Sequence, residues 1–462
     1  MAGIGFILRR LTRRDDILGL VQGYAYSALI TAGPWLFTVF ALAGLSALVP
    51  RTRPDDGMEL FRLIVAYNFC FSLVLSGPLL LVLTRYLADA VYARQVTAVP
   101  GAFVVAYAGV LLAGFLGAIP FYGFYAVLDL PTILAALLNY ALTAGVFLVG
   151  VFLTALKDYR SVTRAFCGGM VVAFLAAWQV ATPETAWPQL LGFSLGLAVI
   201  FFPLAARVFA EYPYPLEAPT TFLSYFKRYR DLALIGLVAN MAIWVDKWVL
   251  WFAPEATEPY HGLVSYPAHD GAMFLAQLCV VPALSVFMVN VETVFFEHYK
   301  RYYSDIQHHA SLDRIRLNQR ELAKTLILTS RNIAVLQACI AALCILVSPR
   351  LADWGLLTAD QLGMFRFGVL GASFQVMLSF CLIVLAYLDR RQDLLWIQAL
   401  YLVLNGVLSW VTMKAGFGFY GYGFFLASLV CMVVGYVVVT LRLRDLLYLT
   451  FIGQNPSVRE VK

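Results

Sequence analysis

The basic residues of this chain alternate between the gaps that separate its apolar stretches. Twelve apolar stretches can be read along the sequence. Of the 33 Lys and Arg residues, 26 lie in every second gap, counting the two ends, four lie in the intervening gaps, and three lie inside the stretches. Basic residues beside short loops stay on the cytoplasmic side of a membrane. The alternation therefore predicts a multi-pass membrane protein with about twelve transmembrane helices and both termini in the cytoplasm.

Most of the stretches exceed the ~20 residues that an α-helix needs to cross the hydrocarbon core of a bilayer. Charged residues make up 13% of the chain and hydrophobic residues 61%, whereas about a quarter of the residues in a soluble domain are charged. This composition excludes an ordinary soluble fold. The net charge of +6 comes from basic residues at helix ends, so we expect no nucleic-acid partner. The predicted spans are 17–49, 59–84, 101–127, 131–154, 161–181, 186–206, 231–252, 272–296, 332–348, 363–388, 394–412 and 419–441.

The first apolar stretch is not a signal peptide in our interpretation. It is long, it is interrupted by Gly33 and Pro34, and it lacks a cleavage site of small residues. We therefore expect it to be retained as the first membrane helix.

The sequence divides near residues 211–230, where several Pro and Glu residues separate two sets of six apolar stretches. We predict an N-terminal six-helix half over 1–215 and a C-terminal six-helix half over 216–462. Each half has its longest inner loop after its second helix, a rhythm typical of transporters with internal repeats. The longer of these loops, 299–331, is charged and carries apolar residues at helical spacing, which predicts a surface helix on the cytoplasmic face.

Ionisable and amide side chains inside the spans are the first candidates for a substrate path. A charged group at bilayer depth costs at least ~2.5 kcal/mol, so each one requires a partner or a water-filled cavity. Asp246 and Lys247 point about 100° apart on a helix and need not pair with each other. A structural clamp between helices is the alternative for these two, and snorkelling to the outer interface is the alternative for the arginines. The candidates are Arg62, Asn68, Asp246, Lys247, Glu292 and Arg366.

Two further features suggest structural or gating roles, and a third suggests part of a path. Gly33 and Pro34 interrupt the first span and form either a hinge or a static kink. Arg85 and Asp89 are spaced i,i+4 where the second helix leaves the membrane, which predicts an ion pair. The outer loop 253–271 has acidic and aromatic residues but no Lys or Arg, which suits a sugar exit path, although a solvated loop is the alternative.

Enzyme motifs are missing from the sequence. There is no Walker lysine loop and no GxGxxG after a strand, and the five histidines show no HExxH spacing. We therefore expect no catalytic residues, no metal and no cofactor, and we expect transport to draw on an ion gradient or on the chemistry of a partner.

Several short motifs occur in order along the whole chain and resemble one family. The motifs are Met1-Ala-Gly-Ile-Gly-Phe6, Gly33-Pro34-Trp35, Arg85-Tyr-Leu-Ala-Asp89, Ile243-Trp-Val-Asp-Lys-Trp248, Tyr387-Leu-Asp-Arg-Arg391 and Phe451-Ile-Gly453. In these motifs the chain resembles the PelG-type inner-membrane transporters of Pel exopolysaccharide systems, in the polysaccharide-transporter branch of the MOP flippase superfamily.

This resemblance implies an all-α, MATE-like fold with a V-shaped pair of six-helix lobes. It also implies export of a growing hexosamine-rich polysaccharide to the periplasm for a biofilm matrix. The superfamily fold would place Arg62, Asn68, Asp246 and Glu292 near a central cleft. The implied partners are a cytosolic glycosyltransferase, a membrane protein that senses cyclic di-GMP and a tetratricopeptide-repeat membrane protein. Two alternatives remain: a scaffold that anchors and activates the transferase, and a flippase for lipid-linked oligosaccharides.

Overall fold

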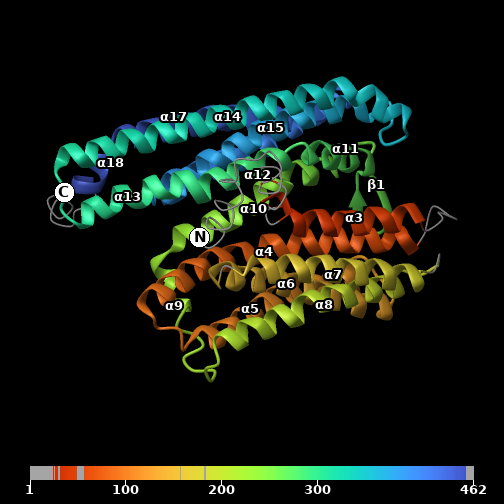
Figure 1. Ribbon diagram of the computed structural model, residues 1–462. Helices are drawn as coiled ribbons and strands as arrows, with labels where there is room; N and C mark the ends of the chain where they lie inside the picture. Colours follow the sequence, from red (N-terminus) through yellow and green to blue (C-terminus); the bar gives the residue numbers. More distant parts are fainter. Residues whose placement is uncertain are drawn as a thin grey trace. The chain divides into compact units, whose positions relative to one another are not determined.

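The chain is almost entirely helical where its structure is described. The computed structural model describes residues 24, 27–29, 32–48, 57–156, 158–181 and 184–453 (Figure 1). Within these residues, eleven helices are long and apolar enough to cross a membrane. The predicted all-α membrane fold is confirmed, and the count of twelve is approximate because much of the first predicted span lies outside the described residues.

One compact unit, here called unit 2, comprises residues Ala32–Pro267. Its two short strands pair as an antiparallel hairpin, with Thr257 opposite Ser265 and Tyr260 opposite Leu263. The elements of unit 2 are α3 (Gly33–Leu48), α4 (Gly57–Ala93), α5 (Val99–Pro120), the π-helical segment η1 (Phe121–Tyr125), α6 (Leu130–Leu156), α7 (Tyr159–Gln179), α8 (Trp187–Glu211), α9 (Leu223–Arg228), α10 (Arg230–Leu250), β1 (Thr257–Tyr260) and β2 (Leu263–Ser265).

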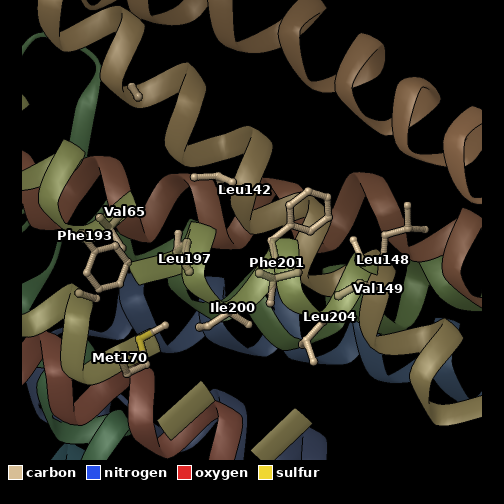
Figure 2. Packing of buried hydrophobic residues seen from close by; sticks show 14 of the residues in the cluster. Val65, Leu142, Leu148, Val149, Met170, Phe193, Leu197, Ile200, Phe201 and Leu204 are labelled. Atoms are coloured by element: carbon tan, nitrogen blue, oxygen red, sulfur yellow. The ribbon is translucent and has the colours of Figure 1, made fainter. Parts of the chain in front are cut away.

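The core of unit 2 forms because α8 presents a large apolar face to its neighbours. Residues of α8 that recur every three or four positions lie on one side of the helix, and Figure 2 shows them packed with side chains of other helices in one cluster. Apolar residues also cover the outer side of α8, as expected for a helix in lipid. The labelled core residues on α8 are Phe193, Leu197, Ile200, Phe201 and Leu204, and Leu148, Val149 and Met170 are among those they join.

Close helix contact in unit 2 depends on glycine. A Cβ atom on Gly236 of α10 would lie 2.2 Å from the carbonyl oxygen of Gly77 on α4, so neither position has room for a larger residue. Helix α4 continues through Pro78 as one 37-residue helix. The Gly77–Pro78 pair therefore supports helix packing without breaking α4.

The other compact unit, unit 1, comprises Met1–Thr31 and Ala268–Lys462. Its described part after residue 268 consists of helical segments joined by short turns. Its elements are α11 (Pro267–Leu278), α12 (Val281–Asn290), the π-helical segment η2 (Val291–Phe295), α13 (Phe296–Gln307), α14 (Leu312–Asp353), α15 (Gln361–Tyr387), α16 (Arg391–Ala415), the 3₁₀ segment η3 (Phe417–Phe419), α17 (Tyr422–Arg444), α18 (Leu446–Tyr448) and the π-helical segment η4 (Leu449–Gly453).

The predicted surface helix over 299–331 is wrong as a separate element. Its residues extend two long helices, α13 and α14, which pack against each other and are joined by a short turn. Of the apolar residues at helical spacing in this segment, Ile315, Leu322 and Leu326 are buried, whereas Leu312 is exposed.

The compact units do not coincide with the predicted halves 1–215 and 216–462. Helix α10 lies beyond the predicted boundary but packs on α4 and belongs to unit 2. The halves were inferred from a repeat in the sequence, whereas the compact units are defined by contacts. The halves therefore remain a prediction.

Candidate substrate path

Asn68 lies in a buried network that joins four elements of unit 2. Its Nδ2 donates to the carbonyl oxygen of Ala136 and to Oδ1 of Asn139, both at 2.9 Å, and its Oδ1 accepts from the hydroxyl of Tyr122 at 2.9 Å. Nδ2 of Asn139 donates in turn to Oγ of Ser194 at 3.3 Å. All four side chains of the network are buried. In this arrangement Asn68 connects α4, η1, α6 and α8, and its hydrogen bonds are made within the protein.

Sequence reasoning identified Asn68, but it missed Tyr122 and Ser194. A tyrosine in an aromatic-rich segment and a serine in an apolar helix give no signal on their own. Only the packing of η1 and α8 shows that their hydroxyls converge on the two amides.

Asp246 is a deeply buried acid on α10. Its side chain is 4% exposed, and its Oδ1 has no hydrogen-bond partner in the described part of the chain. It shares one face of α10 with Ala242 and Leu250, one turn away on either side, and both are buried. A buried carboxylate oxygen without a partner is costly, so its retention suits a group that binds something during a cycle.

Lys247 points away from Asp246, as the helical geometry predicted. Its ammonium lies 5.1 Å from the ring centroid of Trp244, a cation–π contact. Within the described residues no ion pair joins Asp246 to Lys247. The two charges therefore act separately in this structure.

The remaining path candidates are distributed over both units. Arg62 lies partly buried near the start of α4 in unit 2. Arg366 of α15 donates from Nε to Oγ of Ser348 on α14 at 2.9 Å, so it contacts a neighbouring helix. Glu292 lies in the π-helical segment η2, and its side chain is outside the described residues. Single-turn π segments often occur at functional sites.

The predicted ion pair of Arg85 and Asp89 is present, at 3.3 Å. The guanidinium of Arg85 also lies over the ring of Tyr229, 5.4 Å from its centroid, and Arg228 lies 5.3 Å from the same ring. Tyr229 immediately precedes α10. These contacts tie the end of α4 to the start of α10, which suits a structural role.

Gly33 begins α3, directly after a turn at Ala32. Residues 27–29 are also helical, and Oγ of Ser27 donates to the carbonyl oxygen of Ser285 in unit 1 at 3.1 Å. The compact units thus divide just before Gly33 and Pro34. Their predicted hinge role remains a prediction.

The predicted outer loop 253–271 contains the ordered hairpin of β1 and β2, which is fastened to unit 2. The hydroxyl of Tyr67 donates to the carbonyl oxygen of Val264 at 2.9 Å and accepts from its amide at 3.0 Å. Nδ1 of His261 lies 2.8 Å from the carbonyl oxygen of Tyr125. The acidic and aromatic side chains of this loop are therefore held on a fixed backbone.

A second buried polar cluster lies in unit 1, beside a break between α11 and α12. Nε2 of Gln337 on α14 donates to Sγ of Cys279 at 3.4 Å and to Oγ of Ser373 on α15 at 3.0 Å. Oε1 of Gln337 is buried and has no hydrogen-bond partner in the described residues. Sequence analysis missed Gln337, because one glutamine in a long partly charged helix gives no distinguishing signal.

No group of three or more His, Cys, Asp or Glu side chains in the described residues is arranged to hold a metal ion. The polar groups are amides, hydroxyls and isolated charges inside an apolar helical protein.

Comparison with known proteins identifies the family. The family described as "PelG: Putative exopolysaccharide Exporter (EPS-E)" matches residues 1–451. The chain belongs to the PelG family. This family consists of exporters rather than enzymes, and no curated protein matches the chain.

Solved structures similar to this PelG-family chain are transporters of the MOP superfamily. An outward-facing multidrug resistance MATE family transporter is 14% identical, with a TM-score of 0.61, and the match covers 95% of this chain and 98% of that one. A mutant of the Vibrio cholerae MATE transporter VcmN is 11% identical, with a TM-score of 0.60 and coverage of 96% and 97%. A MOP superfamily transporter from Pyrococcus furiosus is 13% identical, with a TM-score of 0.59 and coverage of 96% for both chains. At these identities the likeness establishes the fold, and the family match supports a role in polysaccharide transport.

Proposed function

We propose that this PelG-family protein moves a growing hexosamine-rich exopolysaccharide of the Pel type from the cytoplasm to the periplasm, where it enters a biofilm matrix. The observation that carries the proposal is the match of an exopolysaccharide exporter family over residues 1–451. A transporter fold over almost the whole chain agrees with it.

In the proposed mechanism, polar side chains replace part of the hydration of the polymer as it crosses the bilayer. Asp246 is the leading candidate for coupling, because it combines a buried position with an unpartnered carboxylate oxygen. Binding of a proton or cation at Asp246 or Glu292, or elongation of the polymer itself, would bias the direction of movement. In this proposal both termini lie in the cytoplasm, as the distribution of basic residues suggests.

The proposed partners follow from the family resemblance. They are a cytosolic glycosyltransferase that makes the polymer, a cyclic-di-GMP-sensing membrane protein and a tetratricopeptide-repeat membrane protein. The hairpin of α13 and α14 would offer the transferase a firm surface, because Nε2 of Gln319 donates to the carbonyl oxygen of Leu443 at 2.8 Å and so ties α14 to α17.

Polymer transport can be tested in vesicles that contain the synthase and this protein. We expect polymer to accumulate in the lumen only when both are present. If synthesis proceeds but no polymer becomes protected from an added glycosidase, the proposed function is wrong. If synthesis itself requires this protein and stops when the transferase leaves the membrane, the scaffold alternative is favoured. Lumenal transfer of lipid-linked oligosaccharide alone would favour the flippase alternative.

The role of Asp246 can be tested with Asp246→Asn, which keeps the size of the side chain and removes its charge. We expect export to fall at least about tenfold while intracellular synthesis continues, as for a buried ionisable group in a transport path. Asp360→Asn is a matched control, since Asp360 is exposed before α15. Unchanged secretion from Asp246→Asn, with normal abundance, would reject a direct role for this carboxylate.

A further inference from the structure

Aromatic rings from α4 and the C-terminal end of α10 stack in pairs on unit 2. The rings of Tyr67 and Trp251 lie nearly parallel, with centroids 4.9 Å apart and planes 3° apart. One turn along α4, Phe71 stacks with Trp248 at 6.1 Å and 11°. Phe71 and Tyr67 are themselves 5.9 Å apart.

The same row continues through η1 to the tip of the β hairpin. Tyr67 stacks with Phe121 at 5.7 Å, and Phe121 stacks with Tyr125 at 5.9 Å. The imidazole of His261 lies 5.1 Å from the ring of Tyr125. Rings from α4, α10, η1 and the hairpin thus form one connected row, although the η1 rings lie more than a hundred residues before the α10 rings and the hairpin histidine in the sequence.

The row is buried in the middle and accessible at its ends. Tyr67 is buried, whereas Tyr125 is 56% exposed and Phe71 39% exposed. His261 and Glu258 are also exposed, next to Tyr125 on the hairpin. Buried rings therefore support accessible rings from behind.

The accessible end at Tyr125 is held in place by backbone contacts. Oε1 of Glu258 accepts a hydrogen bond from the amide of Gly262 at 2.6 Å, and His261 contacts the carbonyl oxygen of Tyr125. Gly262 has φ +75°, and a Cβ atom there would lie 2.3 Å from the Tyr125 ring. Only glycine meets both conditions without strain. The hairpin therefore fixes Tyr125, His261 and Glu258 relative to one another.

Such a surface matches the chemistry of a hexosamine. A pyranose ring has an apolar face of C–H groups that packs against an aromatic ring, and a free amino group adds a cation that is attracted to the ring face. A carboxylate beside the ring attracts the same cation and accepts hydrogen bonds from hydroxyl groups.

We propose that Tyr125, His261 and Glu258, with Phe71 at the other accessible end, form a contact site for glucosamine-type units of a polysaccharide. The inference rests on the proposed function, and it names the substrate class and the part of unit 2 that contacts it. The competing interpretation is an interfacial belt, in which aromatic side chains anchor helices at the headgroup level. A belt requires neither the carboxylate of Glu258 nor the fixed hairpin.

Binding can be measured with the full chain in nanodiscs of zwitterionic lipid, titrated with a glucosamine hexamer and followed by tryptophan fluorescence. We expect Tyr125→Ala to weaken binding about fivefold or more, whereas Tyr125→Phe retains it, because the ring face and not the hydroxyl makes the contact. Glu258→Gln keeps an acceptor for the Gly262 amide, and it should weaken binding of the glucosamine hexamer but not of the N-acetylglucosamine hexamer.

The matched control is Trp354→Ala, which removes an aromatic ring that is 69% exposed after α14. A belt residue would behave alike at both positions, so equal affinities for wild type, Tyr125→Ala and Trp354→Ala would overturn the proposed site. Absence of hexamer binding by the wild type would also overturn it. Thermal unfolding of each variant and the retained binding of Tyr125→Phe exclude a folding defect as the cause of lost affinity.

Vesicle transport separates this inference from the proposed function. If the wild type carries polymer into the lumen and Tyr125→Ala and Glu258→Gln do so equally well, the contact site is wrong and the exporter function stands. If the wild type binds the hexamer but carries no polymer, the exporter function fails while the sugar-binding surface stands.

Discussion

Units 1 and 2 each place amide side chains inside an apolar shell, but they differ in how completely the hydrogen bonds are made. In unit 2, both ends of the Asn68 amide are bonded to protein groups. In unit 1, the Gln337 amide donates to two neighbours while its oxygen is left without a partner in the described residues. A fully bonded network rigidifies the helices that it joins, whereas a partly bonded one leaves an acceptor ready for another group.

The backbones beside the two clusters show the same contrast. Helix α4 passes Asn68 and continues through Pro78 without interruption. The crossing next to Gln337 instead breaks at residues 279 and 280, and Pro282 follows within the first turn of α12. Unit 1 therefore has an amide oxygen without a partner in the described residues beside a broken helix, an arrangement that membrane proteins tolerate where a water, an ion or a rearrangement can supply the missing donor.

The largest effect should come from Asn68→Ala. The substitution removes three hydrogen bonds and leaves Oδ1 of Asn139 and the hydroxyl of Tyr122 buried without their partner. We expect a loss of about 2–3 kcal/mol in the free energy of unfolding, measured by denaturant titration in detergent micelles. Asn290→Ala is the control, because Asn290 makes only a local bond to the carbonyl oxygen of Val286 and should cost about 0.5 kcal/mol. Equal effects would show that the network adds no stability beyond a single bond.

A smaller effect is expected for Gln337→Met. Methionine keeps the volume of the side chain and removes an amide whose oxygen has no partner in the described residues, so the lost donor bonds are offset by removal of a buried acceptor. We expect the free energy of unfolding to change by less than about 1 kcal/mol, in contrast to Asn68→Ala. Destabilisation as large as that of Asn68→Ala would mean that the oxygen of Gln337 is bonded in the membrane and that the two clusters are equivalent.

Sequence patterns predicted the membrane helices well, because their signal is local. Apolar length and basic flanks locate α5 through α8 and α15 through α17 with only modest shifts at their ends, whereas α4 extends nine residues beyond its predicted span and α14 begins 20 residues before its own. The segment 299–331 was mispredicted as one helix because helical periodicity does not locate the turn between α13 and α14, and it does not say what the apolar face packs against. Continuous α4 and the broken pair α11–α12 both contain a proline, so a proline in the sequence does not by itself predict whether a membrane helix is broken.

The candidate path was only partly readable for a related reason. Charges and amides inside apolar stretches, such as Asp246 and Asn68, stand out by contrast with their surroundings. Tyr122 and Gln337 do not stand out, because their roles depend on residues far away in the sequence. The ring row shows the same limit, since the stacking of Tyr67 with Trp251 depends on how closely α4 and α10 approach at Gly77 and Gly236.

The smallest change in the free energy of unfolding is expected for a polar group at the surface of unit 2, Asp158. Its substitution tests whether the contrast between the two clusters depends on burial. Asp158 accepts from the amide and hydroxyl of Ser161, at 3.3 and 2.8 Å, and from Nε of Arg207 at 3.1 Å. Burial raises the pKa of the Asp158 carboxyl, but the hydrogen bonds from Ser161 and the charge of Arg207 outweigh it and hold the pKa below its ordinary value. Because the folded-state pKa is lowered, this carboxylate stabilises the fold above the unfolded-state pKa of about 3.9, and the stabilisation is lost as the pH falls through the folded-state value.

We therefore expect Asp158→Asn to lower the free energy of unfolding by less than about 1 kcal/mol at neutral pH, since water screens this group, and to lower it progressively less in acid below about pH 4. Thermal unfolding across this pH range measures the difference. Asp313→Asn serves as the control, because its carboxylate is almost fully exposed and its contact with Arg316 spans 3.9 Å. A loss as large as that of Asn68→Ala would show that hydrogen-bond number, and not burial, sets the strength of these clusters. If the loss in the free energy of unfolding stays constant as the pH falls, the charge of Asp158 does not contribute to stability. The hydrogen bonds of its side chain would then account for the whole loss.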